Sequence, residues 1–305
     1  MALIYDDDKK LERFLNSERI FYKKNVLMST QTSFRIGGLC KFVAFPETFD
    51  KIGKIIKFCK TFNLKFFFLG NGSNLLFSDS NYCGLAISSF MLNKIKLLPN
   101  NEIYCEGGVL LLKLCRFALF HSLSGLEFAY GIPGSLGGAV LMNAGAYGGE
   151  MKDVVSSTLC IDREGNLQVL KNSELKFGYR TSVFNENGAF VLAAKIRCVE
   201  GNQLEIKNKM DALMKKRISK QPLNYPSAGS VFKRPKIGFA SQLIESCGLK
   251  KATVGDAQVS EKHCGFIINL GKASCADVLK LIEFVQCKVK EQKNILLEPE
   301  IKIIV

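Results

Sequence analysis

The sequence predicts an α+β fold, because strand and helix patterns alternate at both ends of the chain. Near the start, an apolar strand at 40–45 precedes a helical pattern over 47–62 and a β-rich segment at 65–69. These segments form a β-α-β unit that runs into GNGSNLL at 70–76. Such a polar turn can donate backbone amides to a pyrophosphate, or it can simply end a strand.

The middle of the chain predicts shorter elements. We expect a strand at 103–105, a helix over 110–121, a hairpin that turns at 162–166 and a strand at 191–199. From about residue 203 the pattern becomes that of an amphipathic helix, with apolar side chains at Ile206, Met210, Leu213 and Met214. We therefore place a domain boundary near residue 203.

The last hundred residues alternate again. A helix at 239–246 ends at Gly248, a strand follows at 265–269, and the chain closes on a strand at 296–305. Between these strands a longer helix follows Ser274, which forms a capping-box pattern with Asp277. This helix should bury one apolar face, made of Val278, Leu281, Ile282, Val285 and Val289.

Composition indicates an ordinary globular protein. The chain has 305 residues, of which 47% are hydrophobic, enough for two or three domains with substantial cores. Its apolar runs are far shorter than the roughly 20 residues that cross a bilayer. Asp6, Asp7 and Asp8 stand where a signal peptide would not place them. We expect a soluble cytoplasmic protein with no membrane partner.

The cysteine pattern argues against disulfides and metal sites. The eleven cysteines include no pair at the CxxC separation, and His121 and His263 are the only histidines. We interpret the cysteines as small buried hydrophobes in a reducing compartment. A metal centre is not expected. We interpret His121, which lies among apolar residues, as a structural residue.

The charge of the chain allows two interpretations. A net charge of +14 suits a protein that binds nucleic acid. The charges are dispersed, however, and Lys51, Lys54, Lys57 and Lys60 recur every three residues on a predicted helix. This spacing is typical of a solvated helix face. We favour an acidic small-molecule substrate and no nucleic-acid partner.

The most informative stretch is GIPGSLGGAVLMNAGAYGG at 131–149, which contains seven glycines. Clustered glycine is destabilising unless the backbone needs positive φ or must approach something closely. A phosphate-bearing cofactor would explain it, and so would a set of tight turns. Common cofactor and hydrolase motifs are missing. Leu75 stands where a Rossmann fingerprint has its third glycine, and no GxSxG occurs. The segment most similar to a P-loop has Ala273 where a serine or threonine hydroxyl is needed.

Six motifs in order make the chain recognisable. They are GNGSN, GIPGSLGGAVLMNAGAYGGE, YRTSVF, KQPLNYPSAGSVFKRP, GDAQVSEKHCGFIIN and LEPE. Together they resemble the UDP-N-acetylenolpyruvoylglucosamine reductase (MurB) family from about residue 30 to the end. Since no further insertion interrupts the middle of the chain, it resembles the shorter, type II branch of that family.

The resemblance implies a fold and a reaction. The fold would be an FAD-binding region of the vanillyl-alcohol-oxidase (PCMH) type at 21–203, in two subdomains split near 85–100. An N-terminal extension at 1–20 would precede it, and an α+β substrate-binding domain at 204–305 would follow. The enzyme would use FAD and NADPH to reduce the enolpyruvyl ether of UDP-N-acetylglucosamine to UDP-N-acetylmuramate, a peptidoglycan precursor required for cell wall, shape and division.

The resemblance also implies which residues hold the cofactor. Two glycine-bearing loops would contact the flavin's pyrophosphate and ribityl chain and leave it facing a pocket formed by the later domain. In the family these positions are Gly70, Asn71, Gly72, Ser73, Asn74, Leu75, Gly131, Pro133, Gly134, Ser135, Gly137, Gly138, Asn143, Ala144 and Gly145. Asn71 stands where glycine is common, but asparagine tolerates a left-handed backbone better than other residues.

Three residues match the family's catalytic positions. Arg180 would stabilise the negative charge that develops on the substrate carboxylate. Ser230 would donate a proton to the carbanionic carbon, where geometry matters more than acidity. Glu300 would assist at the carboxylate by donating a hydrogen bond while protonated. Glu298 has the same parity on the closing strand, so periodicity does not distinguish it from Glu300.

Substrate contacts are carried over less firmly. Lys220 and His263 match positions that contact the nucleotide-sugar, with the lysine ammonium suited to phosphate. Arg234 is counted with them, although asparagine is common there, and Lys251 stands where glycine is common. Two alternatives stay open: another FAD-dependent oxidase or dehydrogenase on the same scaffold, and a basic nucleic-acid-binding protein. No obligate protein partner is expected.

Overall fold

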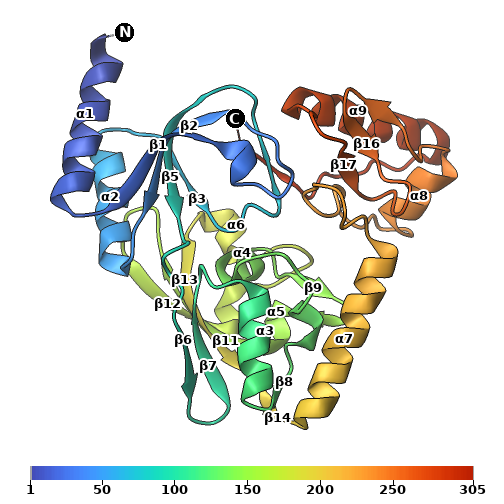
Figure 1. The fold of residues 1–305 in the computed structure, drawn as a ribbon, viewed down its shortest axis with the longest axis horizontal. Helices are drawn as coiled ribbons and strands as arrows, with labels where there is room; N and C mark the ends of the chain where they lie inside the picture. The colour runs from blue at the N-terminus through green and yellow to red at the C-terminus, as the bar shows by residue number, and fades with distance from the viewer. Residues whose placement is uncertain (1, 305) are drawn as a thin grey trace. The chain divides into compact units, whose positions relative to one another are not determined.

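The chain passes repeatedly between two units in the computed structural model, which describes residues 2–304 and the side chains of residues 7–304 (Figure 1). Unit 1 contains the residues up to Val26 together with Lys41–Asn71 and Cys83–Met214. Unit 2 contains Leu27–Cys40, Gly72–Tyr82 and the residues from Lys215 onward. The boundary between the two units that follows Met214 therefore lies inside a helix that starts at Gln203.

Unit 1 begins with a four-stranded sheet in the order β1-β2-β5-β3. Its elements are α1 (Ala2–Ser17), β1 (Phe21–Leu27), β2 (Leu39–Phe45), α2 (Phe49–Thr61), β3 (Phe66–Leu69) and β5 (Tyr82–Ser88). The predicted strand, helix and strand are all present, but β5 lies between β2 and β3 and pairs in parallel with β3. From residue 7 onward, α1 buries Leu11 and Leu15 and stacks Phe14 on Phe58 at 4.2 Å.

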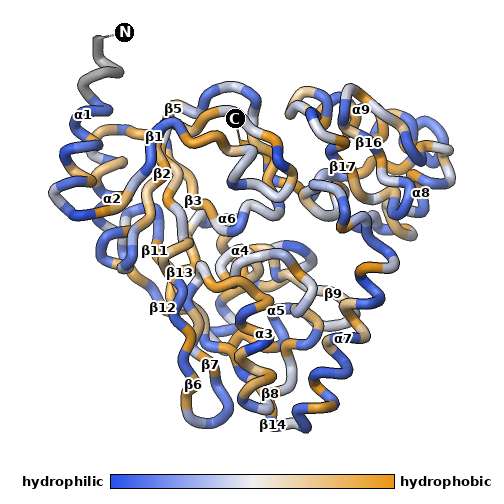
Figure 2. Tube along the Cα trace, viewed as in Figure 1, coloured by the Kyte–Doolittle hydropathy of each residue, from blue (hydrophilic) through white to orange (hydrophobic). Residues whose placement is uncertain are grey.

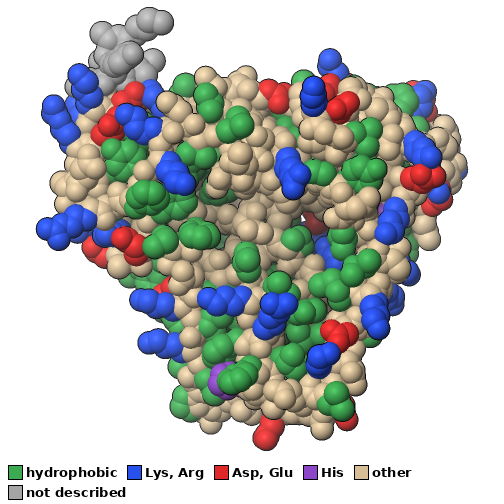
Figure 3. Space-filling view, viewed as in Figure 1, with side chains coloured by type: hydrophobic (Ala, Val, Ile, Leu, Met, Phe, Trp, Pro, Cys, Tyr) green, Lys and Arg blue, Asp and Glu red, His purple; other side chains and the backbone are tan. Residues whose placement is uncertain are grey.

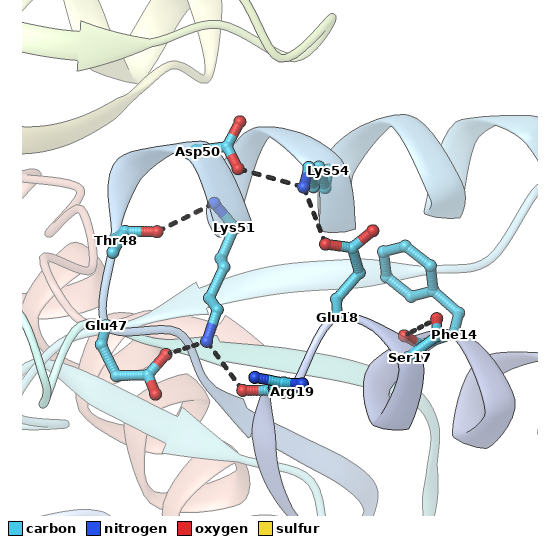
Figure 4. A network of polar contacts seen from close by, with 9 residues as sticks. All are labelled: Phe14, Ser17, Glu18, Arg19, Glu47, Thr48, Asp50, Lys51 and Lys54. Atoms are coloured by element: carbon cyan, nitrogen blue, oxygen red, sulfur yellow. Dashed lines mark hydrogen bonds and ion pairs between the residues drawn. The ribbon is translucent and has the colours of Figure 1, made fainter.

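Two lysines on the lysine-rich face of α2 pair with carboxylates within unit 1 (Figure 4). Lys51 Nζ lies 2.8 Å from Glu47 Oε2, and Lys54 Nζ lies 2.8 Å from Glu18 Oε2. The opposite face of α2 buries Ile52, Ile55, Ile56 and Cys59. These lysines therefore bind carboxylates of their own chain, which supports the solvated-face interpretation.

The second part of unit 1 is a five-stranded sheet in the order β12-β11-β13-β7-β6. Its strands are β6 (Ile95–Leu98), β7 (Glu102–Glu106), β11 (Val155–Ile161), β12 (Leu167–Lys171) and β13 (Phe190–Arg197). Strand β13 is hydrophobic along most of its length, as Figure 2 shows, and pairs antiparallel with both neighbours. The predicted hairpin is confirmed, because Asp162 N donates to Asn166 O between β11 and β12.

Short elements and helices pack on this sheet. They are α3 (Leu111–Phe120), β8 (Leu123–Ser124), α4 (Leu136–Leu141), β9 (Gly145–Ala146), β10 (Gly149–Glu150), α5 (Met151–Val154), α6 (Val183–Asn187), β14 (Val199–Glu200) and α7 (Gln203–Lys220). Ile206 and Met210 of α7 join the buried core of this part of unit 1. His121 ends α3 and lies 4.6 Å from the Phe117 ring, which supports its structural interpretation.

One buried carboxylate fastens α7 to unit 1. Glu127 is 3% exposed, and its carboxylate accepts from Ser124 Oγ at 2.6 Å and from Gly125 N at 3.2 Å. Lys209 of α7 contributes an ammonium 3.4 Å away. Burial raises the pKa of Glu127, but these hydrogen bonds and the lysine charge outweigh burial and lower it below its usual range.

Unit 2 is built on a three-stranded sheet in the order β15-β16-β17. Its elements are β4 (Leu75–Phe77), α8 (Ala240–Ser246), β15 (Thr253–Val254), β16 (Ala257–Val259), β17 (Ile267–Asn269), α9 (Cys275–Lys293) and β18 (Lys302–Ile304). Helix α9 has the predicted capping box and buries the five predicted residues. Its N-terminus also receives Asp79, whose carboxylate accepts from Cys275 N at 2.8 Å and Ala276 N at 3.1 Å.

The closing strand is shorter than predicted. Strand β18 covers only Lys302–Ile304 and pairs in parallel with β4, while residue 305 lies outside the described part. Before β18 the chain forms an isolated antiparallel bridge between Pro299 and Phe232, whose hydrogen bonds run from Lys233 N to Glu298 O and from Glu300 N to Val231 O. The predicted strand at 265–269 likewise begins later, at Ile267.

The cysteine and charge interpretations can be followed in the structure. Nine of the eleven cysteines are buried, and Cys83 and Cys287 are exposed. Among the described residues no cluster of His, Cys, Asp and Glu could hold a metal ion. Basic side chains are scattered among other types on the face visible in Figure 3. No described helix is both long and apolar enough to cross a membrane.

Replacing Glu127 with glutamine tests the anchor of α7. We expect Glu127→Gln to lower the free energy of unfolding by about 2 kcal/mol at neutral pH, because a charged hydrogen-bonded group is lost. Since the pKa of Glu127 is lowered in the fold, its contribution is complete above the usual value of about 4.3 and is lost as pH falls through the folded value. Urea unfolding at neutral and acidic pH measures this difference.

The matched control is Glu205→Gln, at an exposed position on the first turn of α7. This variant should unfold like the parent protein at both pH values. A Glu127→Gln deficit that did not shrink in acid would contradict the charge-based explanation.

Candidate active site

In unit 1 the structure brings Gly70 and Asn71, the start of GNGSN, to the second glycine-bearing loop. Asn71 Nδ2 donates to Pro133 O at 2.6 Å, joining GNGSN to the 131–149 stretch. A Cβ on Gly70 would lie 2.7 Å from Ser135 Oγ, so glycine is needed for this close approach. Asn71 is absent from the residues with positive φ, whereas Gly72 has φ +63°. The left-handed position of the loop is therefore Gly72, and the Asn71 side chain acts as a bridge.

Ser135 has a buried hydroxyl with nothing to bind. The residue is 3% exposed, and its Oγ has no hydrogen-bond partner among the described residues. It precedes α4, yet its side chain does not cap that helix. A buried polar atom without a partner is uncommon and costly, so it points to a ligand or water. Exposed Gly138 lies beside it, and a Cβ there would meet only Ser135 Oγ, at 3.7 Å.

Other glycines of this stretch are explained by packing. Gly137 N donates to Gly107 O at 2.8 Å, and a Cβ on Gly137 would lie 3.1 Å from Val191 O. A Cβ on Gly149 would lie 2.6 Å from the Phe128 ring. The cluster therefore combines close backbone packing with an opening beside Ser135. Gly131 is half-buried, and Gly134 O accepts from Leu111 N.

The second half of GNGSN belongs to unit 2. Gly72, Ser73, Asn74 and Leu75 lie in the Gly72–Tyr82 segment, and Leu75 begins β4. Across the part of the chain that the structure describes, no protein acceptor bonds to the backbone amides of Asn71, Gly72 or Ser73. Unused amides in a glycine-bearing turn suit an anionic ligand.

Arg180 lies at the tip of a tight turn in unit 1. The turn is closed by hydrogen bonds between Gly178 and Thr181, and Arg180 has φ +54°. Its guanidinium donates from Nη2 to Gly145 O at 3.1 Å. A left-handed, non-glycine residue is strained, and such strain clusters at functional sites. Arg180 is thereby placed beside the end of the glycine-rich stretch.

Asn143 and Ala144 lie beneath this turn. Asn143 is 1% exposed, with φ +41°, and its side chain hydrogen-bonds to Glu150, Gly178 O and Lys152 N. Ala144 N donates to Ala139 O, and Ala144 O accepts from Met151 N. Both residues are predicted to contact the cofactor, and in this structure their hydrogen bonds join neighbouring parts of the fold.

Unit 2 brings Ser230, His263 and Glu300 onto neighbouring segments. Ser230 forms a bridge with Phe266, next to the turn that contains His263. On the other side, Glu300 N donates to Val231 O at 2.7 Å. Gly229 has φ +81°, and a Cβ there would meet no atom within 4 Å. The backbone before Ser230 therefore needs glycine for its conformation and is open to an approaching molecule.

Glu298 and Glu300 differ in their surroundings. Glu298 is 69% exposed and pairs with Lys233 at 3.2 Å. Glu300 is half-buried, and its carbonyl accepts from Asn74 Nδ2 at 3.4 Å, while Lys302 N donates to Asn74 O at 3.0 Å. Glu300 is therefore the less exposed of the two, and its catalytic role stays a prediction.

His263 is suited to polar contact as a neutral imidazole. Burial lowers its pKa below the usual value, and its Nδ1 accepts from Gly265 N at 3.2 Å. A neutral imidazole that accepts at Nδ1 carries its proton on Nε2, so His263 can donate a hydrogen bond. The neighbouring Lys262 Nζ donates to Ile218 O at 2.6 Å, which ties this turn to the end of α7.

The remaining substrate candidates lie at the surface of unit 2. Lys220 is exposed at the last position of α7, next to Gln221, whose buried Oε1 has no hydrogen-bond partner within the described part of the chain. The Arg234 guanidinium lies over the Phe239 ring at 4.3 Å. Lys251 has φ +63° and pairs with Glu261, so the position where glycine is common is a left-handed one.

The candidates thus form two sets, each within one unit. Arg180 and the 131–145 positions belong to unit 1, with Gly70 and Asn71, whereas Ser230, Glu300, His263 and the other substrate candidates belong to unit 2. One polar residue was missed. Glu150 accepts from Asn143 Nδ2 at 2.9 Å, and its only sequence signal was an acid directly after the last glycine of the stretch.

Comparison with known proteins extends over nearly the whole chain. Residues 221–304 match the family described as UDP-N-acetylenolpyruvoylglucosamine reductase, C-terminal domain, and residues 40–171 match the FAD binding domain family. The UDP-N-acetylenolpyruvoylglucosamine reductase of Clostridium novyi (strain NT) is 48% identical over 304 residues, covering 100% of this chain and 98% of the relative. That of Caldanaerobacter subterraneus subsp. tengcongensis is 46% identical over 295 residues, covering 97% of each.

A solved structure agrees with these matches. The crystal structure of UDP-N-acetylenolpyruvylglucosamine reductase (MurB) from Thermus caldophilus is 32% identical, has a TM-score of 0.80, and covers 94% of this chain and 99% of that chain. The predicted α+β fold, an FAD-binding region followed by a C-terminal domain, is thereby confirmed. The chain belongs to the UDP-N-acetylenolpyruvoylglucosamine reductase family.

Proposed function

We propose that this chain is an FAD-containing, NADPH-dependent UDP-N-acetylmuramate dehydrogenase. It reduces UDP-N-acetyl-3-O-(1-carboxyvinyl)-glucosamine to UDP-N-acetylmuramate, a precursor of peptidoglycan, in the cytoplasm where NADPH and nucleotide-sugars are available. One observation carries the proposal: the hydrogen bond from Glu300 N to Val231 O joins the backbone of the proposed acid Glu300 to the residue next to the proposed proton donor Ser230. The names of close relatives support the same reaction.

The glycine-bearing loops fit FAD. The unpartnered Ser135 hydroxyl is a hydrogen-bonding group that the protein itself leaves unused, and the unengaged amides of Asn71, Gly72 and Ser73 suit a pyrophosphate. We assign cofactor contacts to these residues and to the exposed backbone at Pro133 and Gly138. FAD held there would supply the redox chemistry that carries a hydride from NADPH to the enolpyruvyl group.

Arg180 has the charge that this addition requires. Hydride addition at the terminal carbon of an enol ether places negative charge on the adjacent carbon and on the carboxylate oxygens. A guanidinium at that carboxylate stabilises this charge more than it stabilises the ground state, and therefore accelerates the step. The hydrogen bond to Gly145 O fixes one nitrogen of the guanidinium in advance.

Ser230 completes the reaction by protonating the carbanionic carbon. A hydroxyl is a weak acid, but the enolate carbon is a strong base, so position decides whether transfer occurs. Glu300 hydrogen-bonds to the substrate carboxylate. Lys220, His263 and Arg234 bind the nucleotide-sugar, with His263 donating from Nε2 and the two cations contacting phosphate.

Ser230→Ala separates the two half-reactions. We expect flavin reduction by NADPH to stay within about twofold of the parent rate, while reoxidation by the enolpyruvyl sugar slows about 10²- to 10⁴-fold, because the proton donor is missing. Stopped-flow absorbance of the flavin under anaerobic conditions measures both rates.

The control is Ser227→Ala in the same PSAGS segment, where only the backbone carbonyl of Ser227 bonds to Ser33 Oγ. This variant should keep both rates. Equal loss of both half-reactions in Ser230→Ala would show that Ser230 is not the proton donor.

Ser135→Ala tests the cofactor site. Removing a buried hydroxyl without a partner should stabilise the apoprotein by about 1 kcal/mol, while FAD binds about tenfold more weakly because a hydrogen bond to it is lost. Denaturation of the apoprotein and titration with FAD measure the two effects.

Thr158→Val is the matched control. Thr158 is 1% exposed on β11, and its Oγ1 also lacks a partner, but it lies outside the glycine-bearing loops. It should stabilise the apoprotein similarly and leave FAD affinity unchanged. If Ser135→Ala left FAD affinity intact, the assignment of this hydroxyl to the cofactor would be wrong.

At position 180 a glycine variant should be more stable than an alanine variant, which reverses their usual order of stability. Both Arg180→Gly and Arg180→Ala should lose reoxidation by substrate, but the glycine variant should be more stable by about 1 kcal/mol, because alanine keeps the left-handed strain. Arg197, exposed at the end of β13, is the control, and there alanine should be the more stable replacement. Thermal unfolding compares the four variants; alanine being the more stable at position 180 would contradict the strain.

A further inference from the structure

A single buried side chain holds the Arg180 turn from beneath. Asn143 Nδ2 donates to Gly178 O, the first residue of that turn, at 2.9 Å. The same nitrogen donates to Glu150 Oε2 at 2.9 Å, and Asn143 Oδ1 accepts from Lys152 N at 2.9 Å. One amide thus ties the end of α4, the start of α5 and the arginine turn into one network.

The turn needs such a support. Arg180 holds a left-handed backbone that an L-residue adopts at a cost, and strained conformations persist only when their surroundings determine them. A second anchor comes from Ser182 Oγ, which donates to Leu141 O at 2.7 Å. Both anchors end on the last residues of α4 or immediately after it, so the turn is fixed to the helix that follows Ser135.

Glu150 adds an electrostatic part to the network. Its carboxylate accepts from Lys152 Nζ at 2.9 Å and from Asn143. The hydrogen bond from Lys152 is the main reason that the pKa of Glu150 lies below its usual value; the Asn143 amide and the charge of Arg180 act in the same direction. The carboxylate that Asn143 orients therefore lies within the field of the Arg180 guanidinium.

The hydrogen-bonding capacity of Asn143 argues against a direct contact with the cofactor. An asparagine amide has two N–H donors, and here one bonds to Gly178 O and the other to Glu150 Oε2. The residue is 1% exposed. Its donors are spent inside the protein, where a bound flavin would not reach them.

We propose that Asn143 is a positioning residue for Arg180, which it places through the backbone of the turn and through Glu150. The inference rests on the proposed function, since it takes Arg180 as the group that acts on the substrate carboxylate. It predicts a defect confined to the half-reaction in which substrate is reduced. A displacement of about 1 Å at a reacting group can reduce a rate about 10²-fold.

Asn143→Gly removes the side chain and keeps the positive φ. We expect bound flavin and its reduction by NADPH to stay within about twofold of the parent, while reoxidation by substrate slows about 10²-fold and KM for the sugar rises. Stopped-flow and steady-state kinetics on the holoenzyme measure these quantities. Equal loss of flavin binding and of both half-reactions would show that Asn143 is a cofactor ligand, and the proposal would fail.

Asn143→Asp gives a second test that does not require the cavity left by glycine. An aspartate keeps the acceptor for Lys152 N but, when ionised, presents oxygen to Gly178 O and Glu150. Reoxidation should therefore be slow at high pH and recover as pH falls, when the protonated acid again donates to one of them. A pH profile parallel to that of the parent enzyme would overturn the proposal.

Two further variants separate the possible failures. Asn172→Asp changes an asparagine whose Nδ2 donates to Lys152 O at 2.9 Å and Val155 O at 2.6 Å but does not reach the arginine turn; it should keep both rates. Arg180→Lys should slow reoxidation. If it does not, the role proposed for Arg180 is wrong; if it does while both Asn143 variants react normally, only the positioning role is wrong.

Discussion

The backbone of residues 134–138 lies directly against strands β7 and β13, and the rest of unit 1's candidate site depends on that contact. Gly137 N donates to Gly107 O, and a Cβ at either glycine would approach Val191 O. Side chains of ordinary size would lift this segment from the sheet. Because it lies so close, Ser135 is buried while its hydroxyl still lacks a partner, and α4 ends where it can hold the arginine turn.

Periodicity predicted the elements that carry many side chains of one kind. Helix α9 buries the five apolar residues expected from its spacing, and α2 lies within the predicted range. The same reasoning did not predict β4 or its pairing with the closing strand β18. Strands of three residues have too little pattern to read, and the β4–β18 pairing joins Leu75 to Lys302, far apart in the sequence. The position of β5 between β2 and β3 was also not predicted, because tertiary packing decides which strands pair.

Sequence motifs identified the candidate site residues, but they did not show which contacts hold these residues in place. The glycine content signalled that backbone approaches something closely, and the structure divides those glycines between packing, as at Gly149, and the opening beside Ser135. Periodicity did not distinguish Glu300 from Glu298; only the match to the family motif did, and the structure adds that Glu298 pairs with Lys233. The left-handed Arg180 was equally hidden, since arginine is not a residue that marks such turns.

The segment Gly72–Tyr82 has an evolutionary consequence. It lies inside the stretch that matches the FAD binding domain family, yet it contributes β4 to the C-terminal unit and caps α9 through Asp79. A gene fragment that encoded only residues 221–304 would leave β18 with an unpaired edge and the first turn of α9 without two of its acceptors. The two halves therefore cannot be exchanged between proteins as independent modules; recombination would have to carry this short excursion along with the tail that it supports.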